Sequence, residues 1–282
     1  PADSAMDNFI DSLDESIKND TNFAKIFIRF GQETSLPYRK KLITNLIFNE
    51  FIIGKIKREA LSEGEDRIPQ LIVVSPTMRC NLTCPGCYSG LYAKEGELSE
   101  KELDGLFREI RDMGIYFVVI SGGEPYLLKD ALLRLFKKYN DMFFLTYTNG
   151  TLLDEDVTYQ LGKLGNVAPA ISVEGWEKET SARRGPKTWD KILSAMSNLR
   201  KNGVLFGMSV TVTSQNMEVV TDPKFAEFFM EKGILFGWYF MFMPVGKDPL
   251  LELIMTPQQR IECGKRVRDL RDRYPLFLAD FW

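Results

Sequence analysis

Six short apolar runs follow one another along most of the chain, and a stretch with helical character separates each run from the next. The runs are Leu71–Ser75, Tyr116–Ser121, Phe143–Thr148, Val167–Glu174, Phe206–Thr213 and Trp238–Val245. Apolar runs that alternate with helices are typical of parallel βαβ units with right-handed crossovers. Six such units fall short of the eight in a closed barrel. The sequence therefore predicts an α/β fold built on a six-stranded, open parallel barrel.

Two of the helical stretches carry a start signal. One opens at Ser99, three residues before Glu102, and the last opens at Thr256, three residues before Gln259. A hydroxyl residue followed three positions later by Glu or Gln is the capping-box pattern of a helix N-terminus. We therefore expect helices to begin at these two positions.

The same patterns divide the chain into three parts. Residues 1–69 form an N-terminal helical segment, residues 70–275 form the barrel, and residues 276–282 begin a C-terminal extension that resembles the start of another strand. Within the first part, Pro1–Asp20 is acidic, whereas Leu36–Ala60 is basic and carries apolar residues at helical spacing. This basic stretch is predicted to pack on the barrel as an amphipathic helix. The alternative is contact with an acidic surface such as a membrane, which suits an apolar stripe with basic flanks.

Three of the four cysteines, Cys80, Cys84 and Cys87, fall within eight residues, and the chain has no histidine. A structural zinc site needs four ligands, nearly always Cys or His. The fourth cysteine, Cys263, lies in register with Val267 on a helix stripe and is predicted to be a buried core residue. Three thiolates suit instead an iron–sulfur cluster with one iron left open. A thiol–disulfide reaction between Cys84 and Cys87 is an alternative, but it leaves Cys80 without a role.

The spacing Cys-x-x-x-Cys-x-x-Cys resembles the cluster motif of the radical S-adenosylmethionine (radical SAM) superfamily. Further motifs of that family follow in the family's order: Gly122-Gly123-Glu124-Pro125, Thr148-Asn149-Gly150, Ser172-Val173-Glu174-Gly175, Arg184-Gly185, and Val212-Thr213 with Asn216. The resemblance covers residues 71–246. It departs from the family at Gly86, where an aromatic residue usually precedes the third cysteine, and at Glu174, where many members carry Asp.

This resemblance implies a (β/α)6 partial TIM barrel, a [4Fe–4S] cluster ligated by Cys80, Cys84 and Cys87, and S-adenosylmethionine bound at the open iron. It also implies an activity, as an oxidoreductase or a transferase. Reductive cleavage of S-adenosylmethionine gives a 5′-deoxyadenosyl radical, which abstracts hydrogen from an unreactive C–H bond. The implied partner is a low-potential electron donor similar to flavodoxin or ferredoxin. Relatives of this kind often continue into a cysteine-rich C-terminal extension.

The resemblance also assigns cofactor contacts to individual residues. Glu124 is expected to accept from the ammonium group of the cofactor, and Arg184 to bind its carboxylate in bidentate fashion. The pair Gly122-Gly123 permits a close backbone approach. Tyr88 is expected to border the adenine in place of the missing aromatic residue. The other cofactor candidates are Asn149, Ser172 and Glu174, for the ribose region, and Thr213.

These candidate residues lie where the predicted strands end, which is the active-site face of a barrel. Alternation along the strands groups further polar residues by face: Thr146 with Thr148, Ser172 with Glu174, and Ser209, Thr211 and Thr213. If these faces point inward, the lumen is polar. A polar lumen is costly to bury unless its groups are satisfied, so it would hold a ligand or water.

The substrate class is predicted only broadly. Tyr239, Met241 and Met243 line an apolar substrate pocket on one interpretation and pack in the core on the other. Together with the basic amphipathic helix, they favour a lipid or another bulky apolar substrate. A peptide is the alternative, because relatives with cysteine-rich extensions often modify peptides. A second alternative is a non-catalytic scaffold that binds a cluster, although such a protein has no need of Glu124 beside it.

Charge and composition argue against several partners. The net charge is −3, so nothing indicates a nucleic-acid partner. The apolar runs are shorter than the ~20 residues of a membrane span, and no signal peptide is visible. Few and clustered cysteines are typical of a reducing compartment. We therefore expect a cytoplasmic protein, with peripheral membrane contact through the basic helix as a further expectation.

Overall fold

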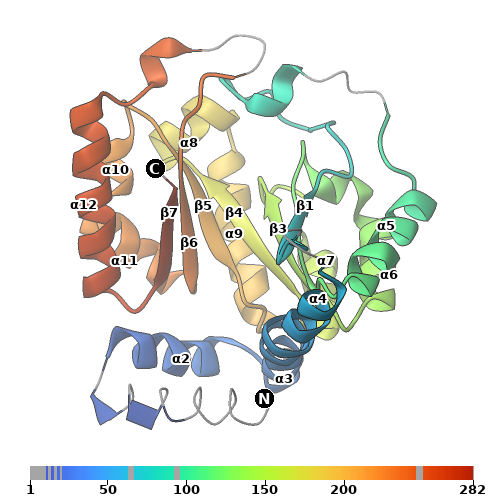
Figure 1. Cartoon of the computed structure of the whole chain (residues 1–282). Helices are drawn as coiled ribbons and strands as arrows, with labels where there is room; N and C mark the ends of the chain where they lie inside the picture. The colour runs from blue at the N-terminus through green and yellow to red at the C-terminus, as the bar shows by residue number, and fades with distance from the viewer. Residues whose placement is uncertain are drawn as a thin grey trace.

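The computed structural model describes residues 11, 14–15, 18–19, 21–62, 67–91, 96–245 and 250–281. Its centre is one curled sheet of seven parallel strands with helices on the outer side (Figure 1). The strands follow one another in chain order: β1 (Leu71–Val74), β2 (Phe117–Ile120), β3 (Phe143–Thr148), β4 (Val167–Val173), β5 (Gly207–Val212), β6 (Phe236–Met241) and β7 (Phe277–Phe281). The predicted open parallel barrel is confirmed.

Helices precede the barrel and connect its strands. Those before the barrel are α2 (Asn22–Glu33), α3 (Leu36–Leu42), the π-helix η1 (Ile43–Gly54) and α4 (Lys55–Leu61). Those of the barrel are α5 (Glu100–Asp112), α6 (Lys129–Lys138), α7 (Glu155–Leu164), α8 (Glu177–Arg184), α9 (Thr188–Lys201), α10 (Met217–Val220), α11 (Pro223–Glu231) and α12 (Pro257–Arg273), with short 3-10 turns η2 (Tyr88–Leu91), η3 (Pro125–Leu128) and η4 (Leu251–Leu253). Both predicted capping boxes are present, at Ser99 before α5 and at Thr256 before α12.

The sheet has seven strands, one more than predicted. β7 pairs with β6 in parallel, so the segment expected to begin a C-terminal extension is a strand of the same sheet. Leu276 and Leu278 are buried there, with 0% and 3% of their surface exposed. The prediction stopped at six because an apolar run indicates that a strand forms but not which neighbour it pairs with. The three-part division of the chain stays a prediction.

Aromatic contacts of β3 identify the two faces of the sheet. Phe144 contacts Phe107 of α5 and Phe136 of α6, with ring centroids 5.3 and 4.6 Å apart. Its side of the strand is therefore the outer, helix-covered one. Tyr147, three residues later in the strand, points to the opposite, inner side, where its ring centroid lies 5.6 Å from that of Phe240 on β6. β3 and β6 are not adjacent in the sheet, so this contact crosses the lumen.

The expected polar lumen is correct for some strands and wrong for others. Thr146 and Thr148 alternate with Tyr147 and so lie on the outer side, where the hydroxyl of Thr146 is hydrogen-bonded to that of Tyr126 (3.0 Å). Strand register places three of the predicted polar residues on the inner side with Tyr147: Ser172, Ser209 and Thr211. Alternation alone could not decide this, because it separates two faces without saying which one is covered by helices.

Aromatic residues of the last two strands lie on the inner side of the sheet. Phe240 stacks on Phe281 with centroids 4.9 Å apart, and Trp238 contacts Phe281 at 5.7 Å. Tyr239 lies on the outer side instead, is fully buried, and donates its hydroxyl to the carbonyl oxygen of Val220 (3.0 Å). The pocket interpretation is therefore wrong for Tyr239, and core packing is correct.

The N-terminal helical segment crosses the amino-terminal ends of the central strands. α3, η1 and α4 continue one into the next between residues 36 and 61. Tyr38 donates its hydroxyl to the carbonyl oxygen of Val167, where β4 begins (2.5 Å), and the backbone N–H of Tyr116, just before β2, donates to Glu50 (2.7 Å). Most of the predicted acidic stretch 1–20 lies outside the described residues. In the part of the chain that is described, no helix has both the length and the hydropathy of a membrane span.

Candidate active site

The cysteine loop follows β1 at the carboxyl-terminal edge of the sheet. Cys80, Cys84 and Cys87 are free and partly buried. A turn joins the last two, because the backbone N–H of Cys87 donates to the carbonyl oxygen of Cys84 (3.3 Å). The backbone N–H of Leu82 points at the sulfur of Cys80 (3.4 Å). The loop thus brings three thiols to the face where barrel enzymes carry their chemistry.

The glycine pair after β2 holds this loop in place. The N–H of Gly123 donates to the carbonyl oxygen of Thr77 (2.9 Å), and the N–H of Glu124 donates to that of Arg79 (2.8 Å). A Cβ atom would lie 2.3 Å from the Thr77 oxygen at Gly122 and 2.0 Å from the Arg79 oxygen at Gly123. The close backbone approach predicted for the pair is therefore an approach to the chain itself, directly before Cys80.

Glu124 joins the ends of β2 and β3 from a fully buried position. Its carboxylate accepts from the hydroxyl of Thr148 (2.8 Å), the backbone N–H of Asn149 (2.8 Å) and that of Tyr126 (3.1 Å). Burial raises the pKa of Glu124, and these donors oppose the rise by stabilising the ionised form. None of its surface is exposed. In this structure the donors to Glu124 are groups of the chain itself.

Asn149 lies beside the first cysteine. Its Nδ2 is 3.8 Å from the sulfur of Cys80 and donates to Oδ1 of Asn81 (2.8 Å). Its own Oδ1 accepts from the backbone N–H of Thr151 (2.9 Å), and the hydroxyl of Thr151 accepts from Asn81 (2.8 Å). Asn81 was not among the predicted site residues, although its position directly after Cys80 indicated that it would lie in the site.

Glu174 binds two arginines near the second cysteine. Its carboxylate accepts from Nη1 of Arg183 (2.6 Å) and from Nε of Arg184 (2.9 Å), and all three side chains are largely buried. Burial alone would lower the pKa of Arg184, but the charges of Glu174 and Cys84 outweigh it and the pKa is raised. Burial raises the pKa of Cys84, and the two arginines act in the opposite direction. The pair thus places positive charge beside the cysteine loop.

The residues around the third cysteine contact other parts of the chain, and the adenine contact of Tyr88 stays a prediction. Tyr88 donates its hydroxyl to the carbonyl oxygen of Gly122 (3.2 Å) and so ties the cysteine loop to β2. Gly86 has a φ of +64°, and a Cβ atom there would lie 2.9 Å from the ring of Phe242. Phe242, which is buried, therefore occupies the space that an aromatic side chain at position 86 would need. Nothing in the sequence pairs these two distant positions.

The last two predicted cofactor residues, Ser172 and Thr213, differ in whether their side chains are hydrogen-bonded within the protein. Ser172 is half-buried on the inner side of β4 and forms no hydrogen bond with the described residues. Thr213, after β5, is engaged in a turn: its N–H and hydroxyl both contact Oδ1 of Asn216 (2.7 and 3.1 Å). Nδ2 of Asn216 in turn donates to the carbonyl oxygen of Glu174 (2.9 Å). Ser172 is thus free to bind a ligand, whereas Thr213 aligns the ends of β4 and β5.

Comparison with known families agrees with this arrangement. The model of the radical SAM superfamily matches residues 74–225, more than half of the chain and the part that contains the three cysteines. The chain belongs to the radical SAM superfamily.

Curated relatives are similar in sequence to the chain over part of their length. The Fe-coproporphyrin III synthase of Methanosarcina barkeri is 31% identical over 169 residues, which cover 58% of this chain and 42% of the synthase. The AdoMet-dependent heme synthase of the same organism is 28% identical over 184 residues, covering 64% and 52%. The chain thus spans about half the length of these curated relatives.

Solved structures confirm the fold. SuiB of Streptococcus suis, bound to S-adenosylmethionine, superposes with a TM-score of 0.67 at 18% identity, covering 86% of this chain and 62% of SuiB. SuiB has also been solved with its precursor peptide SuiA. At this identity the likeness concerns the fold alone.

The donor set fits the [4Fe–4S] cluster and S-adenosylmethionine of the radical SAM superfamily. In the part of the chain that the structure describes, no group of three or more Cys, His, Asp or Glu side chains is placed to hold a metal ion. The cysteines of a cubane bind different iron atoms, so thiols spaced along one loop suit a cluster better than one zinc ion. Donors near Cys80 and the arginines near Cys84 suit the negative charge of a thiolate-ligated cluster. Cys80, Cys84 and Cys87 would hold it.

Proposed function

We propose that this chain is the core of a radical SAM enzyme that removes hydrogen from an unreactive C–H bond. The observation that carries the proposal is the loop of three free cysteines, fixed to the end of β2 by the backbone N–H groups of Gly123 and Glu124. The bound cluster and S-adenosylmethionine supply the chemistry of 5′-deoxyadenosyl radical formation. The chain's own residues hold the loop and shape the lumen beside it.

Polar groups that the fold leaves free are proposed to bind the cofactor. Arg184 uses Nε and Nη2 for Glu174, and a guanidinium has five N–H donors. The remaining donors of Arg183 and Arg184 are proposed to bind the methionyl carboxylate. The free hydroxyl of Ser172 is proposed for the ribose. Glu124 positions Asn149 and is also proposed to accept from the ammonium group of the cofactor, because its three donors leave part of the acceptor capacity of the carboxylate unused.

The side chains that line the lumen favour a bulky apolar substrate. Such a substrate is a lipid or a ring system. Tyr147, Trp238, Phe240 and Phe281 present aromatic surface to it, and stacked or edge-on rings are the contacts such side chains prefer. The two curated relatives are named for a porphyrin and for heme, which supports the same class.

A peptide is the second candidate substrate. The fold likeness to SuiB, which was solved with its precursor peptide, favours it. Fold likeness is weaker support than the lining of the lumen, because one fold serves many substrates.

The test is anaerobic reconstitution with iron and sulfide, followed by a low-potential donor such as dithionite or flavodoxin and S-adenosylmethionine. Roughly four iron atoms per chain and formation of 5′-deoxyadenosine are expected. The triple variant Cys80→Ala/Cys84→Ala/Cys87→Ala should lose both. Cys263→Ala is the matched control, because that thiol is fully buried in the core, and it should keep both.

Two other outcomes decide between the alternatives. A cluster without any 5′-deoxyadenosine would favour the non-catalytic scaffold and contradict the proposal. Deuterium carried into 5′-deoxyadenosine from a labelled porphyrin, or instead from a labelled peptide, would decide between the two substrate classes.

A further inference from the structure

The helix formed by η1 and α4 turns polar side chains toward the barrel. Asn45, which is fully buried, donates to the carbonyl oxygens of Asn140 (2.9 Å) and Met142 (2.8 Å) just before β3. Glu50 and Arg58 form a buried ion pair at 2.8 Å. A helix on the surface of a globular protein usually buries its apolar side instead. Here the side facing the protein contains hydrogen-bonding and charged groups.

The opposite side of this helix is apolar and exposed. Six large side chains, each between 42% and 51% exposed, form what we call the apolar stripe: Ile43, Phe48, Phe51, Ile53, Ile56 and Leu61. Single exposed apolar residues are common, but six large ones on one helix indicate an interaction surface. The stripe lies on the side of the helix away from the catalytic edge of the sheet, because the helix crosses the amino-terminal ends of the strands.

Together with α3, which directly precedes it, this helix is strongly basic. From Leu36 to Leu61 it contains six Lys and Arg against two Glu, a net charge of +4 in a chain whose net charge is −3. Glu50 is neutralised by Arg58, and Glu59 lies 4.0 Å from Lys55. The partner of the stripe is therefore expected to carry negative charge.

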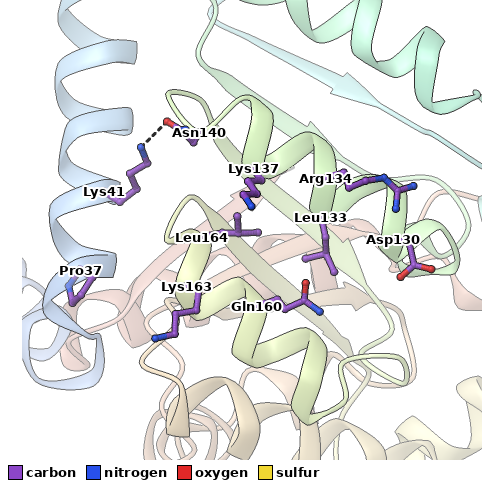
Figure 2. A pocket seen from close by; sticks show the side chains of 10 residues that line it. All are labelled: Pro37, Lys41, Asp130, Leu133, Arg134, Lys137, Asn140, Gln160, Lys163 and Leu164. Carbon is purple, nitrogen blue, oxygen red and sulfur yellow. Dashed lines mark hydrogen bonds between the residues drawn. The ribbon is translucent and has the colours of Figure 1, made fainter.

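A groove of about 720 Å³ begins on the same helix, between α3, α6 and α7 (Figure 2). Its charged lining residues are four cations and one anion: Lys41, Arg134, Lys137, Lys163 and Asp130. Arg134 is paired with Glu100 (2.7 Å), whereas Lys137 and Lys163 form no ion pair with any described residue. Lys41, at the edge of the groove, is two residues from the first residue of the stripe. Apolar and cationic features thus adjoin.

We propose that this face docks on an anionic lipid surface, with the apolar stripe at the headgroup boundary and the groove facing lipid phosphates. Interfacial helices combine an apolar side with basic residues in this way, and each Lys or Arg near an anionic surface strengthens attraction to it. A second copy of the chain fits less well, because a symmetric contact through this helix would bring two segments of charge +4 together.

Vesicle flotation of the full chain tests the proposal without any need for the cluster or a substrate. Vesicles of phosphatidylcholine alone and of phosphatidylcholine mixed with phosphatidylglycerol are compared over a salt series. We expect binding to the phosphatidylglycerol vesicles that weakens as salt rises, since exposed charges are screened. Equal binding to both vesicle types, or binding to neither, would overturn the proposal.

Variants of the stripe test its contribution. Phe48→Ser/Ile56→Ser should weaken partitioning by about tenfold, because half of each apolar side chain is still available for burial. The matched control is Leu251→Ser/Ile261→Ser, which changes two exposed apolar residues of η4 and α12 and should bind as the parent does. Urea unfolding midpoints show that all chains are folded; were a stripe variant to unfold, the salt series on the parent chain would still decide.

Variants of the groove test the charge contribution. Lys137→Glu/Lys163→Glu should reduce binding to phosphatidylglycerol vesicles by about tenfold or more. Lys191→Glu/Lys224→Glu makes the same change in net charge on α9 and α11 and should have a smaller effect. If the two double variants lost equal amounts of vesicle binding, the proposal that this face binds the membrane would be contradicted. Light scattering that shows a dimer dissociated by Phe48→Ser/Ile56→Ser, with vesicle binding unchanged, would assign the stripe to a second copy instead.

Discussion

At the scale of single residues, the cysteine loop depends on backbone contacts that leave no room for side chains. Gly122 and Gly123 touch the carbonyl oxygens of Thr77 and Arg79 more closely than any Cβ atom would allow. The sequence predicted the positions of the cysteines and of this glycine pair. It could not predict what approaches the pair, because the approaching atoms lie more than forty residues earlier in the chain. The same limit applies to Glu124, because two of its three hydrogen-bond donors lie at the end of another strand.

Gly123→Ala is expected to displace the cysteine loop. Its Cβ atom would lie 2.0 Å from the Arg79 oxygen, and relieving such an overlap typically costs about 1–3 kcal/mol. We expect a lower urea midpoint and less iron per chain after reconstitution. The control is Gly105→Ala in α5, where a Cβ atom meets nothing within 4 Å. This substitution should raise the unfolding free energy by up to about 1 kcal/mol. Full iron content in Gly123→Ala would show that the loop does not depend on this contact.

At the scale of secondary-structure elements, helix starts and strand positions were predictable, whereas the orientation of the N-terminal helix was not. Capping boxes are local patterns, and both form as expected. The helix over residues 36–60 was predicted from apolar residues at helical spacing, of which Leu42 is buried while Ile43 and Phe51 are exposed. Spacing shows that a helix has two unlike sides. Buried partners such as Arg58 for Glu50 decide which side faces the protein.

The pair Glu50–Arg58 is expected to hold η1 and α4 against the barrel. Glu50→Ala leaves a largely buried guanidinium without its partner, and breaking such a pair typically costs about 3–5 kcal/mol of unfolding free energy. The double variant Glu50→Leu/Arg58→Met should cost less than the single one, because no buried charge is left over. Urea unfolding of the parent chain, Glu50→Ala and the double variant measures these differences in unfolding free energy. Glu59→Ala, which removes one partner of an exposed pair, should change stability by less than about 1 kcal/mol. A double variant less stable than Glu50→Ala would contradict this account.

At the scale of the whole molecule, the open parallel barrel followed from the alternation of strands and helices, but the number of strands and the lining of the lumen did not. Which side of each strand faces inward depends on packing by distant helices, as Phe144 against α5 and α6 shows. The aromatic lumen also depends on β7, since Phe281 contacts both Trp238 and Phe240. The last strand therefore belongs to the architecture that shapes the proposed substrate site.

A chain that ends at Tyr274 is expected to be less stable than the full chain, because it lacks β7. Leu276 and Leu278 are almost completely buried, and each is expected to contribute about 1.5–3 kcal/mol. Removing them should lower the unfolding free energy by roughly 3–6 kcal/mol and shift tryptophan emission to the red, because Trp238 loses its contact with Phe281. A chain that ends at Asp280 keeps both leucines but loses the half-exposed ring of Phe281, so its unfolding free energy should fall by a smaller amount, about 0.5–1.5 kcal/mol. If both shortened chains unfolded at the same midpoint as the parent, residues 276–282 would act as a separate extension, and the barrel would be complete with the six strands that the sequence predicted.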